Sequence, residues 1–379
     1  MVLLTGCKKS ETAANAPATE IVVGEYGSLT GSEATFGQST HNGLKMAVDA
    51  INAQGGIKGK KVRLVNYDDQ GKTSEVGTAV TRLITSDHVI AVIGEVASSL
   101  SIAGGQIAQQ NGVPMISPSS TNPKVTETGD YIFRVCFVDP FQGLVMARFA
   151  TDPKNKGGLG LKKVAILIDQ RQAYAQGLAK YFEDSLTKIG GQVIDKESYQ
   201  GGDQDFSAQL QKLKQAQPEA IFIPGYYTDI ANIAKQARAI GITAPLLGGD
   251  GWESVQDQGG DAIQGAYYSN HYSVDEKRPE VVNFVSKYEQ MTGKKPDSMA
   301  ALAHDAMMLL KDAIERASTG AEANGIPSHK AVRDALAQTK DFQGITGKIT
   351  MDEHRDAKKP AFVLKIEGKT SPIAYTLAP

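Results

Sequence analysis

The sequence predicts an α/β protein with two doubly wound, Rossmann-like lobes joined by a three-crossing hinge. Short apolar runs alternate with amphipathic stretches of helical length in two separate series, which is the pattern of parallel sheets with crossover helices. The chain has 379 residues, more than one compact core usually holds and enough for two. Its last third places helices in succession without strands between them, so it is expected to cover a lobe rather than build a third sheet.

The first series of elements extends from residue 21 to residue 135. Its expected strands, each a short apolar run, lie at 21–25, 61–68, 89–94, 113–117 and 131–135. Its expected helices lie at 36–52, 74–86 and 100–111. In the first helix Leu44, Ala47 and Ile51 gather toward one face. Gly55 and Gly56 follow this helix, since glycine readily adopts the left-handed conformation that ends helices.

The second series repeats the pattern between residues 163 and 248. Its expected strands lie at 163–168, 192–199, 220–224 and 245–248. Its expected helices lie at 174–189, 206–216 and 229–240. Asp205 precedes the second of these helices and is expected to cap it through its side-chain oxygen.

The last third predicts three helices and two strands. The helices are expected at 280–292, 299–317 and 329–338, and the strands at 347–350 and 361–366. The helices are expected to cover the first lobe and the strands to return to the second. The chain would then cross between lobes near Asp139, His271 and Asp341, a geometry that favours hinge closure.

These crossings define the expected domains. The first lobe would comprise 21–139 with 272–340, and the second would comprise 140–271 with 341–379.

Composition and motifs exclude several classes of function. The chain carries 40 basic and 42 acidic side chains, a net charge of -2, and no dense basic block, so no nucleic-acid partner is expected. No apolar run approaches the roughly 20 residues that span a bilayer. A dinucleotide-binding G-x-G-x-x-G, a P-loop, a G-x-S-x-G and metal-ligand histidine spacing are all missing. We therefore expect no enzyme and no cofactor.

The two cysteines predict different roles. Cys7 ends the run LTGC, which resembles the lipobox of bacterial lipoproteins, where a signal peptide is cut before a cysteine that then carries lipid. The polar, Ala-rich stretch that follows is typical of a flexible tether. Residues 1–20 are thus expected to be a signal remnant and tether that anchor the protein on the extracytoplasmic face of the membrane; the alternative is an accidental apolar start. Cys136 is expected to be a buried free thiol.

Two clusters of hydroxyl side chains are the most informative feature of the chain. Each follows an apolar run, in VIGEVASSLSIA (Val92–Ala103) and VPMISPSST (Val113–Thr121). The hydroxyls are those of Ser98, Ser99, Ser101, Ser119, Ser120 and Thr121. Open α/β sheets bind ligands at such strand ends, and loop amides beside a helix start suit a small anion such as a carboxylate. The alternative is that these side chains only cap helices.

Several segments in order resemble one family. They are the two hydroxyl clusters with GSLTGSEATFGQ (Gly27–Gln38), 43–70, PGYY (Pro224–Tyr227), 234–242 and GGDGW (Gly248–Trp252). From about residue 21 to its end, the chain is similar to type I periplasmic solute-binding proteins of the branched-chain amino-acid (Leu/Ile/Val) group. The resemblance implies a monomer that delivers an amino acid to an ABC permease complex in the inner membrane.

The family binds the α-carboxylate and α-ammonium of an amino acid between its lobes. Carried over by position, Ser98 would hold the carboxylate with its hydroxyl and amide, Thr121 with its hydroxyl and Ser119 with its backbone. Asp250 stands where the family places an acid for the ammonium, and Tyr226 would close over the ligand from the opposite lobe. The best-known leucine binders have a glutamate in place of Asp250, so the shorter aspartate requires a closer ligand or an intervening water.

Selectivity is predicted from aromatic residues. Phe36, Tyr174 and Trp252 fall near positions that line or cover the ligand in relatives, which favours an aliphatic or aromatic ligand. Trp252 could wall an apolar pocket or cover the ammonium, and the alternative is core packing or a surface lid. Glu95 is expected to face solvent or to cap the next helix. The alternative function is a sensory module of the same fold for an amide, urea or aromatic acid.

Overall fold

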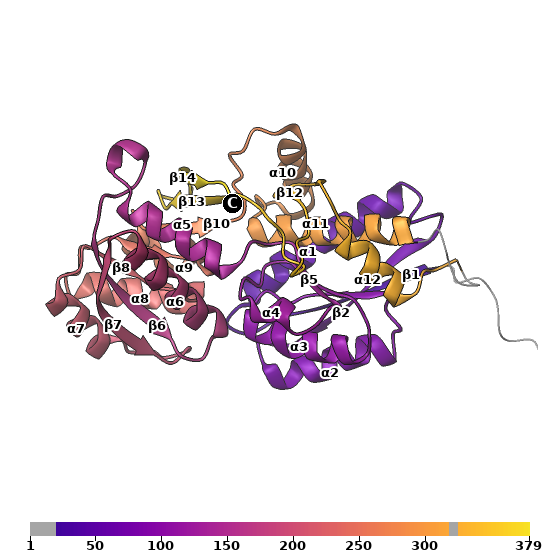
Figure 1. The fold of residues 1–379 in the computed structure, drawn as a ribbon, viewed down its shortest axis with the longest axis horizontal. Helices are drawn as coiled ribbons and strands as arrows, with labels where there is room; N and C mark the ends of the chain where they lie inside the picture. The colour runs from indigo at the N-terminus through magenta and orange to yellow at the C-terminus, as the bar shows by residue number, and fades with distance from the viewer. Residues whose placement is uncertain (1–19, 318–324) are drawn as a thin grey trace, which may run out of the picture.

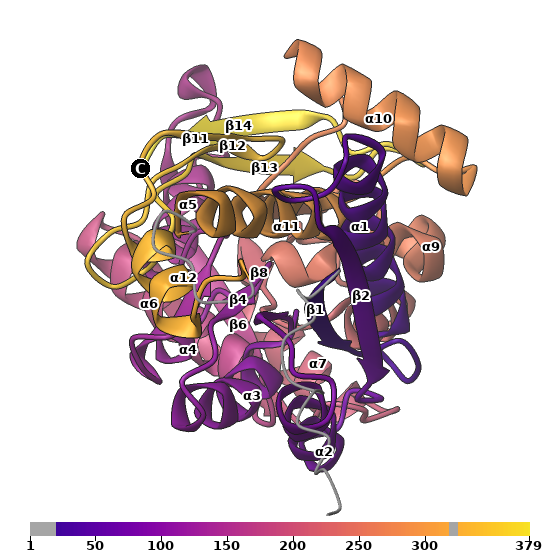
Figure 2. The same ribbon diagram turned by 90° about the vertical axis from the view of Figure 1, so that its right-hand side faces the viewer.

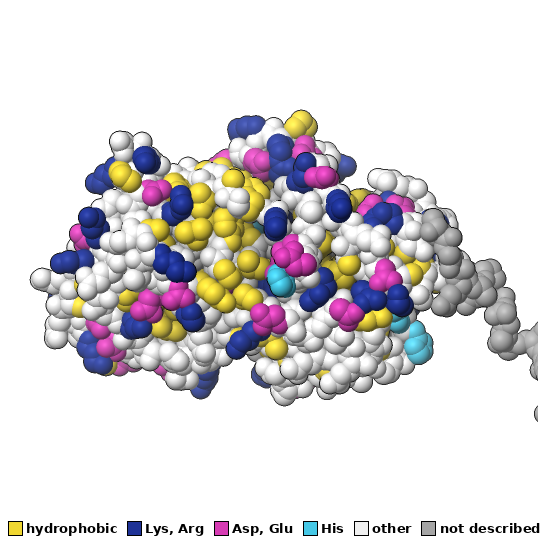
Figure 3. Space-filling model, viewed as in Figure 1, with side chains coloured by type: hydrophobic (Ala, Val, Ile, Leu, Met, Phe, Trp, Pro, Cys, Tyr) yellow, Lys and Arg dark blue, Asp and Glu magenta, His cyan; other side chains and the backbone are white. Residues whose placement is uncertain are grey.

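The computed structural model describes residues 20–317 and 325–379. Cys7 and the predicted tether therefore lie outside the described residues, except for Glu20. Among the helices described, none is long and apolar enough to cross a membrane. On the face drawn in Figure 3, acidic and basic side chains are interspersed, in keeping with the nearly balanced charge.

The first lobe contains a parallel five-stranded sheet in the order β2-β1-β3-β4-β5. Its strands are β1 (Glu20–Gly27), β2 (Lys61–Asp68), β3 (Ala91–Ile93), β4 (Met115–Ser117) and β5 (Ile132–Arg134). Its connecting helices are α1 (Ala34–Ala53), α2 (Thr73–Thr85), α3 (Ser98–Gln110) and α4 (Lys124–Glu127). The strand order reverses at β1, which creates the switch point where such sheets bind ligands.

The second lobe contains a seven-stranded sheet in the order β14-β13-β10-β9-β8-β6-β7. Its parallel strands are β6 (Lys163–Asp169), β7 (Gln192–Tyr199), β8 (Ala220–Phe222), β9 (Leu246–Gly248) and β10 (Tyr267–Asn270). Two antiparallel strands, β13 (Ala361–Lys365) and β14 (Ile373–Leu377), extend it at one edge. The two lobes lie side by side in Figure 1. The predicted fold of two doubly wound α/β lobes is confirmed.

Helices pack against the second sheet, among them α5 (Asp139–Thr151), α6 (Ala173–Lys188) and α7 (Ser207–Ala216). The other helical segments of this lobe are η1 (Lys154–Lys156), α8 (Tyr227–Ala239), η2 (Asp250–Trp252), α9 (Val255–Gly259) and η3 (Gly260–Ile263). As predicted, the Asp205 carboxylate accepts a hydrogen bond at the start of α7, from the Ser207 amide at 2.9 Å.

The helices of the last third cover the first lobe, as predicted. They are α10 (Pro279–Thr292), α11 (Ser298–Ala317) and α12 (His329–Ala337). Apolar residues of α11 and α12 share a core with those of β1, β3 and α1. Figure 2 shows α11 beside α1. The two helices approach closely at Gly43, where a Cβ atom would lie 2.2 Å from the Ala300 carbonyl oxygen, so only glycine fits there.

The prediction that residues 347–350 return to the second lobe is wrong. They form β12 (Gly347–Ile349), which pairs with β11 (Phe342–Gly344) in a two-stranded sheet of its own. The apolar side chains of Ile349 and Met351 are buried with those of α11 and α12 in the core of the first lobe, which holds the hairpin there. The chain joins the second sheet only at β13, so this hairpin follows the predicted crossing at Asp341 yet packs with the first lobe.

The predicted burial of Cys136 is confirmed. Its thiol is free and buried in the first lobe, and burial raises its pKa to about 12. A thiol that stays protonated at physiological pH is unreactive, so this cysteine serves packing.

Candidate functional site

The two hydroxyl clusters lie next to each other at the carboxyl edge of the first sheet. The parallel pairing of β3 with β4 places the loops after Ile93 and Ser117 side by side. The Ser98 hydroxyl accepts a hydrogen bond from the Asn122 amide at 3.3 Å, at the first residue of α3. The hydroxyls of Ser119 and Thr121 are buried without a hydrogen-bond partner among the described residues. This edge therefore presents unused donors at a helix N-terminus, which suit an anion.

Ser120 does not share this role. Its hydroxyl contacts the Ser101 hydroxyl at 2.7 Å and donates to the backbone oxygen of Val96 at 2.8 Å. The Arg134 guanidinium donates to the Ser120 carbonyl at 2.5 Å. Ser120 and Ser101 thus hold the two hydroxyl loops together, instead of pointing into the space between the lobes.

Glu95 does not face solvent, so that part of the prediction is wrong, whereas its contact with the residue before α3 agrees with the expected helix cap. Its carboxylate is buried and accepts hydrogen bonds from the amide and hydroxyl of Ser28, at 3.0 and 2.8 Å, and from the Ala97 amide just before α3. Burial, together with the charge of Asp69, raises the pKa of Glu95 to about 8. The side chain ties the loop after β1 to the loop after β3 and fixes the geometry of the hydroxyl edge.

Asp250 provides an acceptor from the opposite lobe. It follows β9 at the start of the η2 turn and is 3% exposed. One carboxylate oxygen accepts from the Gln142 side-chain amide at 2.7 Å, and the other contacts Nε2 of His271 at 2.9 Å. Burial lowers the pKa of His271, which favours the neutral ring. Because an ionised carboxylate only accepts, Nε2 carries the ring proton, and both neighbours orient Asp250 without cancelling its charge.

Asp139 is a third buried acid near this point. Both of its carboxylate oxygens lack a hydrogen-bond partner within the described part of the chain, and Thr121 lies close without a well-formed bond to it. A Cβ atom at Gly177 would lie 3.2 Å from one of these oxygens. Burial raises the pKa of Asp139 to about 8, so the carboxyl is mostly protonated at neutral pH.

Three aromatic rings form a wall where the lobes meet. The rings of Tyr174 and Tyr226 are stacked with centroids 5.4 Å apart, and Phe36 of the first lobe meets Tyr226 edge-on at 6.0 Å. The Tyr174 hydroxyl accepts from the Gly251 amide at 3.2 Å. These contacts bring one predicted residue of the first lobe against two of the second.

Trp252 is not part of this wall. Its ring is fully buried and its Nε1 donates to the Ile223 carbonyl at 2.9 Å. The ring packs flat against Gly248, where a Cβ atom would come within 2.1 Å of it. The position of Trp252 therefore agrees with core packing, rather than with a pocket wall, a cover for the ammonium or a surface lid.

The lobes are closed on a small cavity between them. Seven of the predicted residues line it: Phe36, Ser98, Ser119, Thr121, Tyr174, Tyr226 and Asp250. Val96, Gly251 and Met299 complete the lining. The cavity measures about 10 Å³, roughly the volume of one water-sized probe, so an amino acid can enter only if the lobes separate and the side chains readjust.

Hydrogen bonds between the lobes flank this cavity. The Ala173 amide donates to the Ser99 hydroxyl at 3.1 Å, and the Asn122 side chain donates to the Ala173 carbonyl at 2.7 Å. On the other side the Thr228 hydroxyl donates to the Ser32 carbonyl at 3.0 Å. Polar contacts of this kind are expected of an interface that opens and closes.

Comparison with known proteins identifies the family. The periplasmic binding protein family matches residues 20–371. The chain belongs to this family. The Leu/Ile/Val-binding protein homolog 3 of Brucella melitensis biotype 1 is 31% identical over 352 residues, which is 92% of each chain. A periplasmic binding protein works outside the cytoplasm, so the predicted extracytoplasmic location is supported at that level.

Solved structures of periplasmic binding proteins share the fold. A leucine binding protein LivK from Thermotoga maritima superposes with a TM-score of 0.88 at 37% identity, covering 95% of this chain and 99% of that one. The branched-chain amino acid transporter substrate binding protein LivJ from Streptococcus pneumoniae, in complex with isoleucine, superposes with a TM-score of 0.86 at 33% identity, covering 95% and 100%. The predicted resemblance to the branched-chain amino-acid group is confirmed.

Proposed function

We propose that this protein binds an amino acid with an aliphatic side chain between its lobes and delivers it to an ABC permease. One observation carries the proposal. A single cavity joins the acidic side chain of Asp250, from one lobe, to the unpartnered hydroxyls of Ser119 and Thr121, from the other. An acceptor at one end and donors at the other match the two charged ends of an α-amino acid.

The charges of the ligand explain why both ends are needed. Closure takes a carboxylate and an ammonium out of water, and each costs several kcal/mol unless a partner replaces the solvent. Ser98, at the start of α3, and Ser119 and Thr121, in the loop after β4, supply neutral donors for the carboxylate. Asp250, held by Gln142 and His271, supplies the acceptor for the ammonium.

The remaining lining favours an aliphatic side chain. Phe36, Val96 and Met299 bring apolar surface to the cavity, and the stacked tyrosines cover it. The relatives add support, because one solved relative holds isoleucine and others are named for leucine or for Leu/Ile/Val binding. Relatives of this kind serve transport and are not enzymes.

The sensory alternative fits the cavity less well. An amide, urea or aromatic acid brings no ammonium, so closure would bury the Asp250 carboxylate without a cation. An uncompensated buried charge is strongly unfavourable.

The proposal extends to the anchor and the lobes. The LTGC run supports lipidation of Cys7, with the following residues as a tether that holds a monomer near an inner-membrane permease. For the lobes we propose 21–139 with 272–357, and 140–271 with 361–379. The packing of Ile349 and Met351 in the first core is the reason for moving the third crossing beyond 341.

Titration calorimetry with matched leucine analogues tests the proposal. Leucine, isoleucine and valine are expected to bind. Leucinamide, which lacks the carboxylate, and 4-methylpentanoate, which lacks the ammonium, are each expected to bind at least about 30-fold more weakly than leucine, a loss of about 2 kcal/mol for one unpaired charged group. If 4-methylpentanoate or benzoate bound as tightly as leucine, the ammonium would have no role and the sensory alternative would be favoured.

A further inference from the structure

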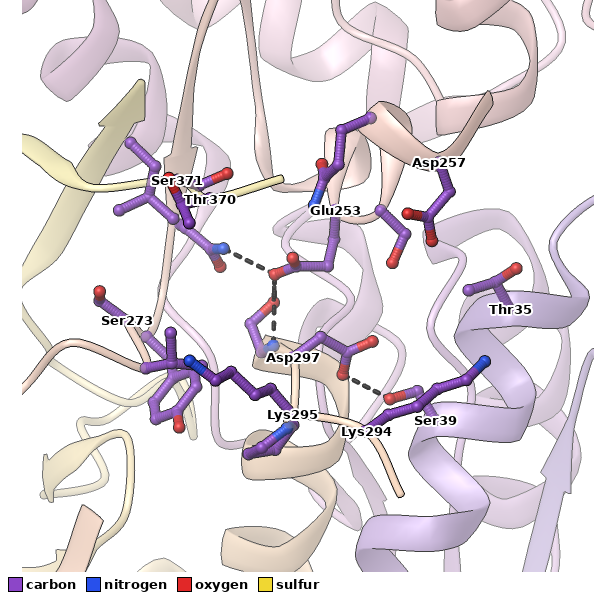
Figure 4. Close-up of a pocket in the computed structure, with 18 of the residues that line it drawn as sticks. Thr35, Ser39, Glu253, Asp257, Ser273, Lys294, Lys295, Asp297, Thr370 and Ser371 are labelled. Carbon is purple, nitrogen blue, oxygen red and sulfur yellow. Dashed lines mark hydrogen bonds between the residues drawn. The ribbon is translucent and has the colours of Figure 1, made fainter. Parts of the chain in front are cut away.

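A second and larger cavity lies between the two lobes. It measures about 470 Å³, within the range of small-molecule sites, and shares no lining residue with the cavity at Asp250. Its walls come from α1, the α9 region, the end of β10, the segment between α10 and α11 and the turn between β13 and β14 (Figure 4). The proposed amino-acid site leaves this cavity without a role.

Two carboxylates, one from each lobe, face each other in this cavity (Figure 4). One oxygen of Glu253 accepts from the Ser298 hydroxyl at 2.6 Å and from the Asn270 side chain at 2.7 Å. One oxygen of Asp297 accepts from the Ala300 amide at 2.9 Å and from the Ser39 hydroxyl. Within the described residues, the side-chain hydrogen bonds of Glu253 all involve Oε2 and those of Asp297 all involve Oδ1. Oε1 of Glu253 and Oδ2 of Asp297 can therefore accept hydrogen bonds from a ligand.

The two carboxylates repel each other, and no lysine or arginine side chain is paired with either of them among the described residues. Burial and the nearby Glu253 charge raise the pKa of Asp297 to about 7. Lys294, Lys295 and Lys369 stand among the lining residues, yet the structure pairs none of them with either carboxylate in the part of the chain it describes. Two like charges held together in a cavity favour binding of a cation between them.

An independent feature also indicates a ligand here. Tyr272 lines the same cavity and is only 2% exposed, and its buried hydroxyl has no hydrogen-bond partner among residues 20–317 and 325–379. Most buried polar groups in proteins are paired, and leaving one unpaired is unfavourable. A polar guest in the cavity would supply the missing partner.

We propose that this cavity is a second binding site, for a small molecule that carries a primary ammonium group. An ammonium has three N–H donors, and Glu253, Asp297 and Tyr272 offer three unused acceptors. A metal ion fits less well, because no group of three or more His, Cys, Asp or Glu residues suited to a metal occurs in the described chain. Since one carboxylate belongs to each lobe, the guest would bridge them in the closed form.

Calorimetric titration of the full chain with propylamine tests this site. The experiment is done at pH 8 with saturating leucine, which occupies the first site. We expect saturable 1:1 binding of propylamine and none of propionate. A parallel titration with β-alanine shows which kind of ammonium compound the site prefers. Tighter binding of β-alanine than of propylamine indicates a zwitterion whose carboxylate also contacts Lys294, Lys295 or Lys369. Equal binding indicates a simple amine.

Variants and pH separate a built site from nonspecific attraction. Glu253→Gln and Asp297→Asn should each weaken propylamine binding at least about tenfold, whereas Asp261→Asn, at an exposed position of η3 outside the cavity lining, should change it less than about twofold. Asparagine also caps helices well, so α11 is expected to persist in Asp297→Asn.

In the wild-type protein, binding should weaken as the pH falls from 8 to 6, because Asp297 takes up a proton. This readout requires no variant to fold. The proposal is overturned if propylamine binds no better than propionate, if both carboxylate variants bind as wild type does, or if wild-type affinity is the same at pH 8 and pH 6.

Discussion

Leucine is expected to bind the Asp250→Ala variant at least about 30-fold more weakly than the wild-type protein, a loss of about 2 kcal/mol. The closed cavity offers the ligand ammonium one ionised partner, and alanine removes it while closure still excludes water. Gln142 and His271, which hold the carboxylate at 2.7 and 2.9 Å, are neutral side chains and cannot replace its negative charge. Titration calorimetry with leucine measures the loss directly.

Two further variants make the result specific. Asp261→Ala removes an exposed acid that does not line the cavity and should leave the affinity for leucine unchanged. Asp250→Asn keeps the shape of the side chain and removes its charge, so it should bind nearly as weakly as Asp250→Ala. An Asp250→Ala protein that melts like wild type and binds leucine with wild-type affinity would remove Asp250 from the site.

The Asp139→Asn variant is expected to be more stable than wild type by at least about 2 kcal/mol at pH 8, and to differ little at pH 4. In the folded protein burial raises the pKa of Asp139 to about 8, whereas the unfolded chain ionises it near the ordinary value of 3.8. Between these values the folded state binds the extra proton, so rising pH destabilises the fold. Asparagine has a similar shape and no proton to lose.

Urea unfolding followed from pH 4 to pH 8 measures this difference. The free energy of unfolding of the wild type should fall across this range relative to that of Asp139→Asn. Glu95 also has a raised pKa and contributes a slope of the same sign, but it is present in both proteins and cancels in the comparison. Parallel stability curves for the two proteins would show that Asp139 ionises normally in the fold.

Elements of the fold that depend on local pattern were predictable from the sequence, and those that depend on distant packing were not. The strands and helices of both series follow from apolar runs and helical periodicity. Helix α5 is not among the helices predicted from the sequence. It is buried on most sides between the sheet and α6, so its apolar residues do not gather on a single face. Strand β10 carries the polar pair Ser269 and Asn270, whose partners Gln142 and Glu253 lie 127 and 17 residues away in the sequence.

Some residues of the candidate site were likewise predictable from local sequence pattern, and others were not. A hydroxyl at the end of a strand can be recognised once the strand itself is predicted. Ser98, Ser119 and Thr121 could therefore be predicted from the sequence segments in which they lie. The role of Asp250 came from the family resemblance. Nothing near Gln142 indicates that it contacts Asp250, 108 residues later, because that contact exists only once α5 packs beside β10. No local pattern separates the buried Trp252 ring from a cavity wall.

A crystal structure of the protein with bound leucine tests the central claim most directly. We expect the ligand between the lobes, with its ammonium about 3 Å from the Asp250 carboxylate and its carboxylate within hydrogen-bond distance of Ser98, Ser119 or Thr121. Leucine bound in the reverse orientation, or outside this cavity with Asp250 still bonded only to Gln142 and His271, would contradict it.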